Sequence, residues 1–498
     1  MILVLVVQVA STSSAADAKL TRKPVDEKSA GLLFYEDFMN QHPSLITLQK
    51  WLDTYLNFEK LPQKDIFWLD TMEYLCQITN HPQKSFPSVH VAGSKGKGST
   101  SVMIASILEA AGYKSGLYTS PHILDFSERI GSAQGPLPEQ VYEAAAQELM
   151  TTVEAIPSEN LPGQRALTWF ELVTTFAFLC FRQAHLDWAV FETGLGGRLD
   201  ATNVLEPRLS VITPIELEHT EFLGNTIEKI AGEKAGIIKS GTPVVIVPQK
   251  EAALKVLEAK AKELQCPLLK VEEQVQVQGK MVAGKMELCL ESKLFARPIT
   301  TRLSLLGDYQ LWNAATAALA VKTLFPELPE EAIEKGLSQA KLPGRFEVLQ
   351  WQGNPVVLEG AHTPTSVALS LQTFCQYLED TQPSAVCGET CHDTTNARKP
   401  HLLFACAADK DVNTMAQLFS DFGSIVLTRP GGEKQSNPQL LQSAFTEAGH
   451  EFTYISDFKE AIQKALEQAK KDAAPLLVTG SFYLVAEVKK FLQEASTF

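Results

Sequence analysis

The stretch VAGSKGKGSTSVMIASILEAAGY, residues 91–113, contains three glycines and two lysines within six residues. The residues just before it, SFPSVHVAG, contain β-branched valines and predict a short strand that ends at Gly93. Behind the glycines, apolar residues from Val102 to Ala111 recur with a helical period. A glycine-rich turn between a strand and a helix lets backbone N–H groups surround an anion, and the helix N-terminus adds its own donors and dipole. We therefore expect this loop to bind a phosphate in an α/β fold.

The side chains of the loop suit a nucleotide. Lys97 is expected to reach the outer phosphates, and Ser99 or Thr100 to place a hydroxyl near a metal ion. The spacing departs from the standard nucleotide-binding loop, because Gly98 separates Lys97 from Ser99 and no glycine occupies position 91. Taken by itself, the stretch also fits a tight strand-to-helix turn with solvated lysines.

Size and charge limit the possible classes of protein. The chain of 498 residues is long for one domain and sufficient for two or three. Apolar residues make up 45% of it, which is enough for sizeable buried cores. The formal net charge of −14 argues against a surface that binds duplex nucleic acid, because such a surface must be basic. An anionic substrate would have to meet a local cluster of lysine and arginine instead.

The eight cysteines are scattered and favour a reducing, cytoplasmic setting. Cys387, Cys391 and His392 lie close together, but no second pair follows at the spacing of a zinc site, so a metal site is not expected there. The first ten residues, MILVLVVQVA, are too few to span a bilayer and lack the basic start of a signal peptide. We expect residues 1–30 to be a disordered or dispensable leader, with a secretory signal as the alternative.

Helix-like and strand-like segments alternate from about residue 45, which is typical of an α/β sheet. Residues 268–303 show fewer helical signals and predict a small antiparallel excursion. LPGRFE, residues 342–347, contains a Pro-Gly turn and precedes a second alternation of strands and helices. We expect a nucleotide-binding P-loop domain over residues 31–341 and a smaller, Rossmann-like α/β domain over residues 342–498.

Several further blocks follow the loop in a fixed order. They are YTSPH (118–122), FETGLGGRLDATNV (191–204), IELEHTEFLGNTIEKIAGEKAGIIK (215–239), LLGDYQLWNAATAALA (305–320), LPGRFE, LEGAHTPTS (358–366) and LLVTGSFYLVAEV (476–488). With GSKGKGST they resemble the folylpolyglutamate synthase/dihydrofolate synthase family of Mur-type ligases, from about residue 45 to the C-terminus. The resemblance implies an ATP-dependent ligase in which a carboxylate of a folate or of dihydropteroate becomes an acyl phosphate. The amino group of L-glutamate would then displace the phosphate and form an amide.

The resemblance also implies roles for single residues. The ATP site would comprise Gly93, Gly96, Lys97, Gly98, Ser99, Thr100, Asn313, Arg345 and Glu359. Mg²⁺, or Mn²⁺ in its place, would be bound by Ser120, Glu192 and His219; serine and carboxylate oxygens suit such a hard ion. The catalytic residues would be Lys97, His219, Lys234 and His362, with Lys234 carried as a carbamate whose negative charge supports the metal. The pterin-bearing substrate would lie at Asp200 and Asn203.

The chain departs from the family pattern at three positions. Glu218 and Glu359 stand where the family usually has aspartate, which keeps the charge but moves it by one methylene. Tyr309 replaces the usual histidine. Trp169 and Phe170 are expected to belong to the core rather than to contact substrate.

Two other functions share features with this sequence. A cell-wall Mur ligase shares the chemistry, but it carries an extra N-terminal domain for a uridine nucleotide, and only about 85 residues precede the loop here. A nucleotide-binding protein without catalysis would not need Glu192, His219 and Lys234 together. We expect a cytoplasmic monomer that acts on small molecules and binds neither nucleic acid nor membrane.

Overall fold

The structure is a computed structural model that describes residues 42–57, 68–382, 398–432 and 434–496. Residues 41–498 form one compact unit by their contacts, and all elements discussed below belong to it. The expected leader, residues 1–30, and the Cys387–His392 segment lie outside the described residues. None of the helices in the described ranges combines the length and the apolar character that a membrane span requires.

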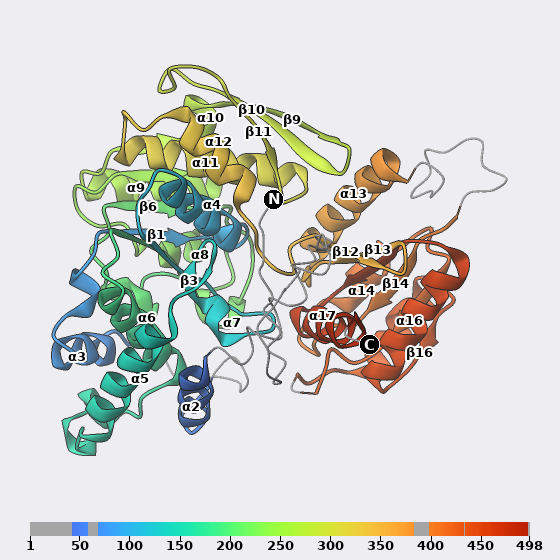
Figure 1. Ribbon diagram of the computed structural model, residues 1–498, viewed down its shortest axis with the longest axis horizontal. Helices are drawn as coiled ribbons and strands as arrows, with labels where there is room; N and C mark the ends of the chain where they lie inside the picture. The colour runs from blue at the N-terminus through green and yellow to red at the C-terminus, as the bar shows by residue number, and fades with distance from the viewer. Residues whose placement is uncertain (1–41, 58–67, 383–397, 433, 497–498) are drawn as a thin grey trace, which may run out of the picture. The chain divides into compact units, whose positions relative to one another are not determined.

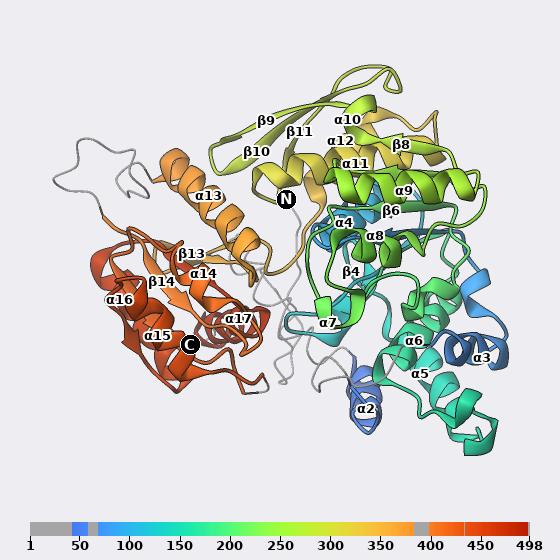
Figure 2. The ribbon, with the colours of Figure 1, turned by 180° about the vertical axis from the view of Figure 1, so that it is seen from behind.

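Eight strands of the described residues form one sheet (Figures 1 and 2). Across the sheet they run β4 (Gly135–Pro136), β3 (Ile130–Ser132), β2 (Ser115–Tyr118), β5 (Trp188–Glu192), β1 (Ser88–Ala92), β6 (Leu209–Ile212), β7 (Val244–Ile246) and β8 (Leu268–Lys270). The six strands from β2 to β8 are parallel, whereas β3 and β4 pair antiparallel at one edge. Parallel strands must be covered on both faces, which explains why these strands are apolar almost throughout.

Alternate residues of the strands contact helices on opposite faces of the sheet. Val89, Val91 and Val211 share a core with helices α4 (Lys97–Ala110), α11 (Asp308–Leu324) and α12 (Glu330–Gln339). On the other face, Phe191 packs with α5 (Glu139–Glu154) and α6 (Trp169–Gln183), and Ile212 packs with α8 (Ile227–Ala235) and α9 (Glu251–Glu263). The smaller helices α2 (Pro43–Leu52) and α3 (Asp70–Ile78) extend the core that α5 and α6 form.

The antiparallel excursion is shorter than the range 268–303. A separate sheet has the order β11-β10-β9 and consists of β9 (Gln276–Val282), β10 (Lys285–Glu291) and β11 (Ile299–Leu303). β8, at residues 268–270, instead pairs parallel with β7 and continues the main sheet. Sequence periodicity cannot separate the two cases, because three residues are too few to show alternation.

The C-terminal part of the chain forms a second α/β sheet with its own helices. Its sheet has the order β12 (Glu347–Trp351), β13 (Asn354–Leu358), β17 (Leu476–Thr479), β14 (His401–Phe404), β15 (Ser424–Leu427) and β16 (Thr453–Tyr454). Only β12 pairs antiparallel among these described strands. The helices of this part are α13 (Pro364–Thr381), α14 (Val412–Ala416), α15 (Pro438–Glu447), α16 (Phe458–Asp472) and α17 (Phe482–Ser496).

Helix α4, which follows the glycine-rich loop, is buried on nearly every side. Residues from Gly98 to Leu108 are all buried between the sheet and helices α11 and α12. α12 approaches α4 closely at Gly336, where a Cβ atom would lie only 2.4 Å from the Cα of Ile107. The Ser106 hydroxyl donates to the Gly336 carbonyl at 2.7 Å across the same contact. The position of the loop therefore depends on a glycine more than 200 residues away.

Gly336→Ala should destabilise the protein by about 2 kcal/mol, because the added methyl group meets backbone rather than a mobile side chain. The matched control is Gly232→Ala in α8, where a Cβ would meet no atom within 4 Å. This control should stabilise the protein by up to about 1 kcal/mol through helix propensity. Denaturant unfolding of both variants measures the difference; equal stabilities would contradict the close packing of α12 on α4.

Candidate functional site

A large cavity collects residues from both α/β parts of the unit. Its volume is about 1980 Å³, beyond the roughly 300–1,000 Å³ that holds one drug-sized ligand. The expected site residues on its wall are Gly96, Lys97, Gly98, Ser99, Ser120, Glu192, Asp200, His219, Asn313, Arg345, Glu359 and His362. Gly93, Thr100, Asn203 and Lys234 lie outside this lining. The cavity therefore has room for more than one substrate.

Glycine is required at two positions of the loop between β1 and α4. Gly93 has φ +154°, and a Cβ there would lie 1.8 Å from the Thr213 hydroxyl oxygen, on the neighbouring strand end. Gly96 has φ +78° and caps α4, and a Cβ there would lie 2.6 Å from Oδ1 of Asn313. The first amides of α4 lack intrahelical acceptors, as in every helix, so they are available to an anion in the cavity.

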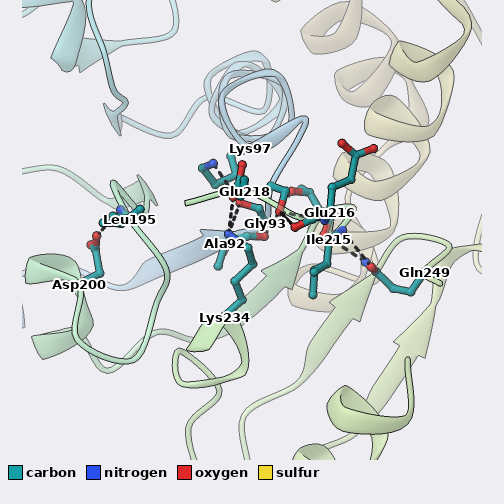
Figure 3. Close-up of polar contacts among 12 residues, drawn as sticks. Ala92, Gly93, Lys97, Leu195, Asp200, Ile215, Glu216, Glu218, Lys234 and Gln249 are labelled. Carbon is teal, nitrogen blue, oxygen red and sulfur yellow. Dashed lines mark hydrogen bonds and ion pairs between the residues drawn. The ribbon is translucent and has the colours of Figure 1, made fainter. Parts of the chain in front are cut away.

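The loop is tied to the segment that follows β6. The backbone amides of Ser94 and Lys95 both donate to the carbonyl of Pro214, at 2.8 and 3.2 Å. The Ser94 hydroxyl donates to the Glu216 carbonyl and accepts from the Glu216 amide. Figure 3 shows this segment, with Ile215 and Glu216, beside the loop. These bonds fix the entrance of the loop, and the amides nearer α4 remain for a ligand.

A hydrogen-bond network joins the start of α4 to helix α11. Gln310 donates to the Ser99 hydroxyl at 3.3 Å and accepts from the Asn313 amide at 2.8 Å. Thr100 donates to Oδ1 of Asn313 at 3.4 Å. Asn313 therefore lies beside the loop. Gln310 was missed by the sequence analysis, although it stands within a block that the resemblance used.

Glu192 ends strand β5 and is almost completely buried beside the loop. Its Oε2 accepts from the Ser120 amide at 3.2 Å, and a Cβ on Gly98 would lie 3.3 Å from the same oxygen. Burial raises the pKa of Glu192, whereas the charges of Lys97 and Arg345 act to lower it. A buried carboxylate at the end of a parallel strand, close to a phosphate loop, is suited to bind a cation.

Lys234 and Lys97 converge on the same carbonyl oxygen. Lys234, on α8, is 1% exposed and donates to the Gly93 carbonyl at 2.8 Å; Lys97 donates to that carbonyl at 3.0 Å. Lys234 also forms an ion pair with Glu218 at 2.8 Å (Figure 3). Burial lowers the pKa of Lys234 to about 8, although Glu218 opposes this effect. Burial acts to raise the pKa of Glu218, but the charges of Lys234 and Lys97 outweigh it and lower that pKa to about 2.

His219 stands at the N-terminus of the short helix α7 (Thr220–Leu223) with φ 45°. This left-handed conformation is uncommon for a residue other than glycine, although histidine adopts it more often than most. His219 lines the cavity, as does Lys410 from the loop after β14. Lys410 forms an ion pair with Asp409 at 2.8 Å and was missed by the sequence analysis. The rule that ligands gather after the carboxyl ends of parallel strands would have found it.

The second α/β part contributes a cation, a carboxylate and an imidazole to the cavity wall. The Arg345 guanidinium lies 4.2 Å from the centre of the Phe482 ring. Oε2 of Glu359 accepts from the Phe346 amide at 2.8 Å, and burial raises the pKa of this carboxylate. Nδ1 of His362 donates to the Gly360 carbonyl at 2.8 Å, which leaves Nε2 as an acceptor while the ring is neutral. Burial lowers the pKa of His362 to about 4, so this ring is neutral at physiological pH.

Asp200 and Asn203 organise the loop between β5 and β6. Asp200 accepts from the backbone amides of Leu195, at 2.8 Å, and Thr202, at 3.0 Å. The Asn203 amide donates to the carbonyls of Arg198 and Gly236, at 2.9 and 3.1 Å. Asp200 reaches the cavity wall, whereas the lining does not include Asn203.

Trp169 and Phe170 both reach the cavity wall, and Trp169 is also part of the buried core. The Arg129 guanidinium lies 4.9 Å from the centre of the Trp169 ring. Phe170 packs so closely against Gly194 that a Cβ there would lie 2.3 Å from the ring. The two aromatic rings thus combine the expected core role with a place on the wall.

Glu218→Gln should destabilise the protein by about 3 kcal/mol, because it leaves the buried Lys234 ammonium without its counter-charge. Adding Lys234→Met should restore most of this loss, since both charges are then absent. The surface pair Lys255–Glu251 is the control, and Glu251→Gln should change stability by less than about 0.5 kcal/mol. Denaturant unfolding of the three variants tests this; a loss at Glu218 no larger than at Glu251 would refute the assigned ion pair.

Comparison with known proteins identifies related sequences and structures. Residues 91–321 match the Mur ligase middle domain, and residues 344–482 match the Mur ligase glutamate ligase domain. A dihydrofolate synthase/folylpolyglutamate synthase of Bacillus subtilis is 32% identical over 458 residues, which is 89% of this chain and 98% of the relative. A Mycobacterium tuberculosis folylpolyglutamate synthase complexed with ADP and AMPPCP superposes with a TM-score of 0.76 at 27% identity, covering 90% of this chain and 98% of that one. An FPGS–AMPPCP–folate complex has a TM-score of 0.72 at 27% identity, covering 90% and 99%.

Proposed function

This chain belongs to the Mur ligase family, in its folylpolyglutamate synthase/dihydrofolate synthase branch, and on that premise we propose that it joins L-glutamate to a pteroyl substrate at the expense of ATP. The pteroyl substrate is a folate, dihydropteroate, or both. ATP phosphorylates the substrate carboxylate to an acyl phosphate and leaves as ADP. The glutamate amine then attacks the acyl carbon, and phosphate departs as the amide forms.

One observation carries the proposal. The glycine-rich loop with Lys97 shares a single cavity with Arg345, Glu359 and His362 of the C-terminal part. Two anions, the γ-phosphate and a carboxylate, must meet for the first step, so their mutual repulsion has to be offset by fixed positive charge. Lys97 and Arg345, which both line this cavity, meet that need. The folate and ATP-analogue complexes of structural relatives support the same assignment.

We propose that Ser120, Glu192 and His219 hold Mg²⁺, or Mn²⁺ in its place, together with the phosphates of ATP. The donor set fits the ion, because Glu192 is a buried carboxylate that lies next to Ser120 and supplies hard oxygen. Mg²⁺ commonly binds one or two carboxylates plus substrate phosphates, so few protein ligands suffice. When bound, the ion would neutralise phosphate charge during the transfer.

We propose in addition that Lys234 takes up CO₂ as a carbamate in the working enzyme. Carbamate formation requires an unprotonated amine, and the lowered pKa of Lys234, about 8, makes this form accessible. The nearby Lys97 would face the new negative charge, whereas Glu218 would repel it unless a cation lies between them. An intact-mass measurement under non-denaturing conditions should show one added CO₂ in the wild type and none in Lys234→Arg; equal masses apart from the substitution would overturn the modification.

The proposal also covers the domains, the oligomeric state and the location of the enzyme. We propose an ATP-binding ligase domain over residues 31–341 and a glutamate-ligase domain over residues 342–498. The two family matches, residues 91–321 and 344–482, fall within these ranges. We also propose that the enzyme is a monomer in the cytoplasm, where ATP and folates are available. With the loop in one domain and His362 in the other, closure of the two domains would keep water from the acyl phosphate.

The function is tested by ADP release from purified protein with MgATP, L-glutamate and one pteroyl substrate at a time. Release should require both glutamate and either a reduced folate or dihydropteroate, and the product should gain one glutamate by mass. A UDP-muramoyl substrate should give no release. ADP release that is independent of every pteroyl substrate would reject the proposal.

Lys97→Ala should lower kcat by at least about 100-fold, because it removes a charge that acts on the transferring phosphoryl group. Its fold should persist, since the Lys97 amine makes one bond to a carbonyl that Lys234 also serves. Lys255→Ala, on the exposed face of α9, is the matched control and should turn over normally. Circular dichroism and steady-state kinetics decide the matter, and wild-type kcat in Lys97→Ala would exclude the assigned role.

A further inference from the structure

A buried chain of hydrogen bonds connects strand β1 to the loop between β5 and β6. His90, on β1, is completely buried, and its Nε2 lies 2.7 Å from the Thr202 hydroxyl oxygen. The Thr202 hydroxyl bonds in turn to Oδ1 of Asp200. Oδ2 of Asp200 accepts from the Leu195 amide at 2.8 Å, as Figure 3 shows. His90 is three residues before Gly93, so this chain of hydrogen bonds runs from the strand that precedes the glycine-rich loop to the Asp200 loop on the cavity wall.

The direction of every proton in this chain follows from the acceptors. Each oxygen of Asp200 accepts a backbone N–H, from Thr202 or from Leu195; burial raises the pKa of Asp200, whereas these bonds favour the ionised carboxylate, which acts as an acceptor. The single hydroxyl proton of Thr202 therefore points to Asp200, and the Thr202 oxygen must accept from His90. His90 is then the neutral tautomer with its proton on Nε2.

Burying His90 costs free energy, which indicates that the histidine has a role at this position. Nδ1 of His90 has no hydrogen-bond partner among the described residues, although it is buried. An unsatisfied buried polar atom is costly, and an apolar residue at this strand position would avoid the cost. Burial lowers the pKa of His90 to about 3, so the ring keeps the neutral, donating form throughout the physiological range. The donor at Nε2 is thus permanent.

The loop that these hydrogen bonds hold, between β5 and β6, forms part of the cavity wall. Gly194, Leu195, Leu199, Asp200 and Ala201 all line the cavity, next to Phe170. The wall depends on Asp200, because its carboxylate ties the amides at residues 195 and 202 together. We propose that His90 and Thr202 are positioning residues that set the orientation of Asp200 and thereby shape the wall against which the pteroyl group binds. The identity of that group rests on the proposed function. The hydrogen-bonded series His90–Thr202–Asp200, called the relay below, does not.

Two matched pairs of variants test the relay. His90→Gln places an amide N–H as many bonds from Cα as Nε2 of histidine, whereas His90→Asn places it at the level of Nδ1. Thr202→Ser keeps the hydroxyl, whereas Thr202→Val keeps the shape and loses it. His90→Asn and Thr202→Val should raise the KM for the pteroyl substrate about tenfold and leave the KM for MgATP within about twofold, because one buried hydrogen bond is lost on one wall only. His90→Gln and Thr202→Ser should both remain close to the wild type.

A second measurement needs no substrate. Amide hydrogen exchange of peptides covering residues 194–203 should accelerate in His90→Asn and Thr202→Val and stay near the wild-type rate in the other two. If exchange there is unchanged, or if the KM for MgATP rises as much as that for the pteroyl substrate, the relay has no positioning role. If the wild type turns over no pteroyl substrate, the proposed function fails, and the exchange rates alone decide for or against the relay.

Discussion

The site depends on one carbonyl oxygen, that of Gly93, which accepts hydrogen bonds from two lysines. Lys234 approaches it from α8 at 2.8 Å and Lys97 from α4 at 3.0 Å. A carbonyl has two lone pairs, so it can hold both amines, but it cannot neutralise two positive charges. Glu218 balances one of them through its ion pair with Lys234. The remaining positive charge lies at the start of a helix whose first amides also favour an anion.

This arrangement is possible only because side chains are absent at particular points. Gly93 brings the loop against Thr213, and Gly96 brings it against Asn313. Farther away, Gly336 lets α12 lie against the backbone of α4, so the helix that begins at the loop is held in place over its length. The charges converge because the backbone can approach the neighbouring elements closely. These glycines thus matter because they leave room for neighbouring atoms, as well as because of their backbone freedom.

Burial and charge also divide the cavity into distinct regions. Glu192 and Glu359 are buried carboxylates whose pKa values burial raises, and each lies near a cationic side chain. His362 is neutral, with an acceptor nitrogen left over. The wall made by Phe170 and the Asp200 loop presents an aromatic ring, and the Asp200 carboxylate holds that loop by hydrogen bonds. Phosphate chemistry and an aromatic substrate can therefore occupy one cavity without competing for the same groups.

Local periodicity and ordered glycine-rich blocks were enough to predict the strand–loop–helix at residues 88–110, the α/β class, the second alternation after residue 342 and the family. The sequence alone did not reveal that β8 continues the main sheet, since three residues carry no period. Nor could it pair Lys234 with Glu218, link Gln310 to Ser99 or join His90 to Thr202. Those contacts connect residues up to 211 positions apart, and only the packing of strands and helices brings their side chains within hydrogen-bond distance.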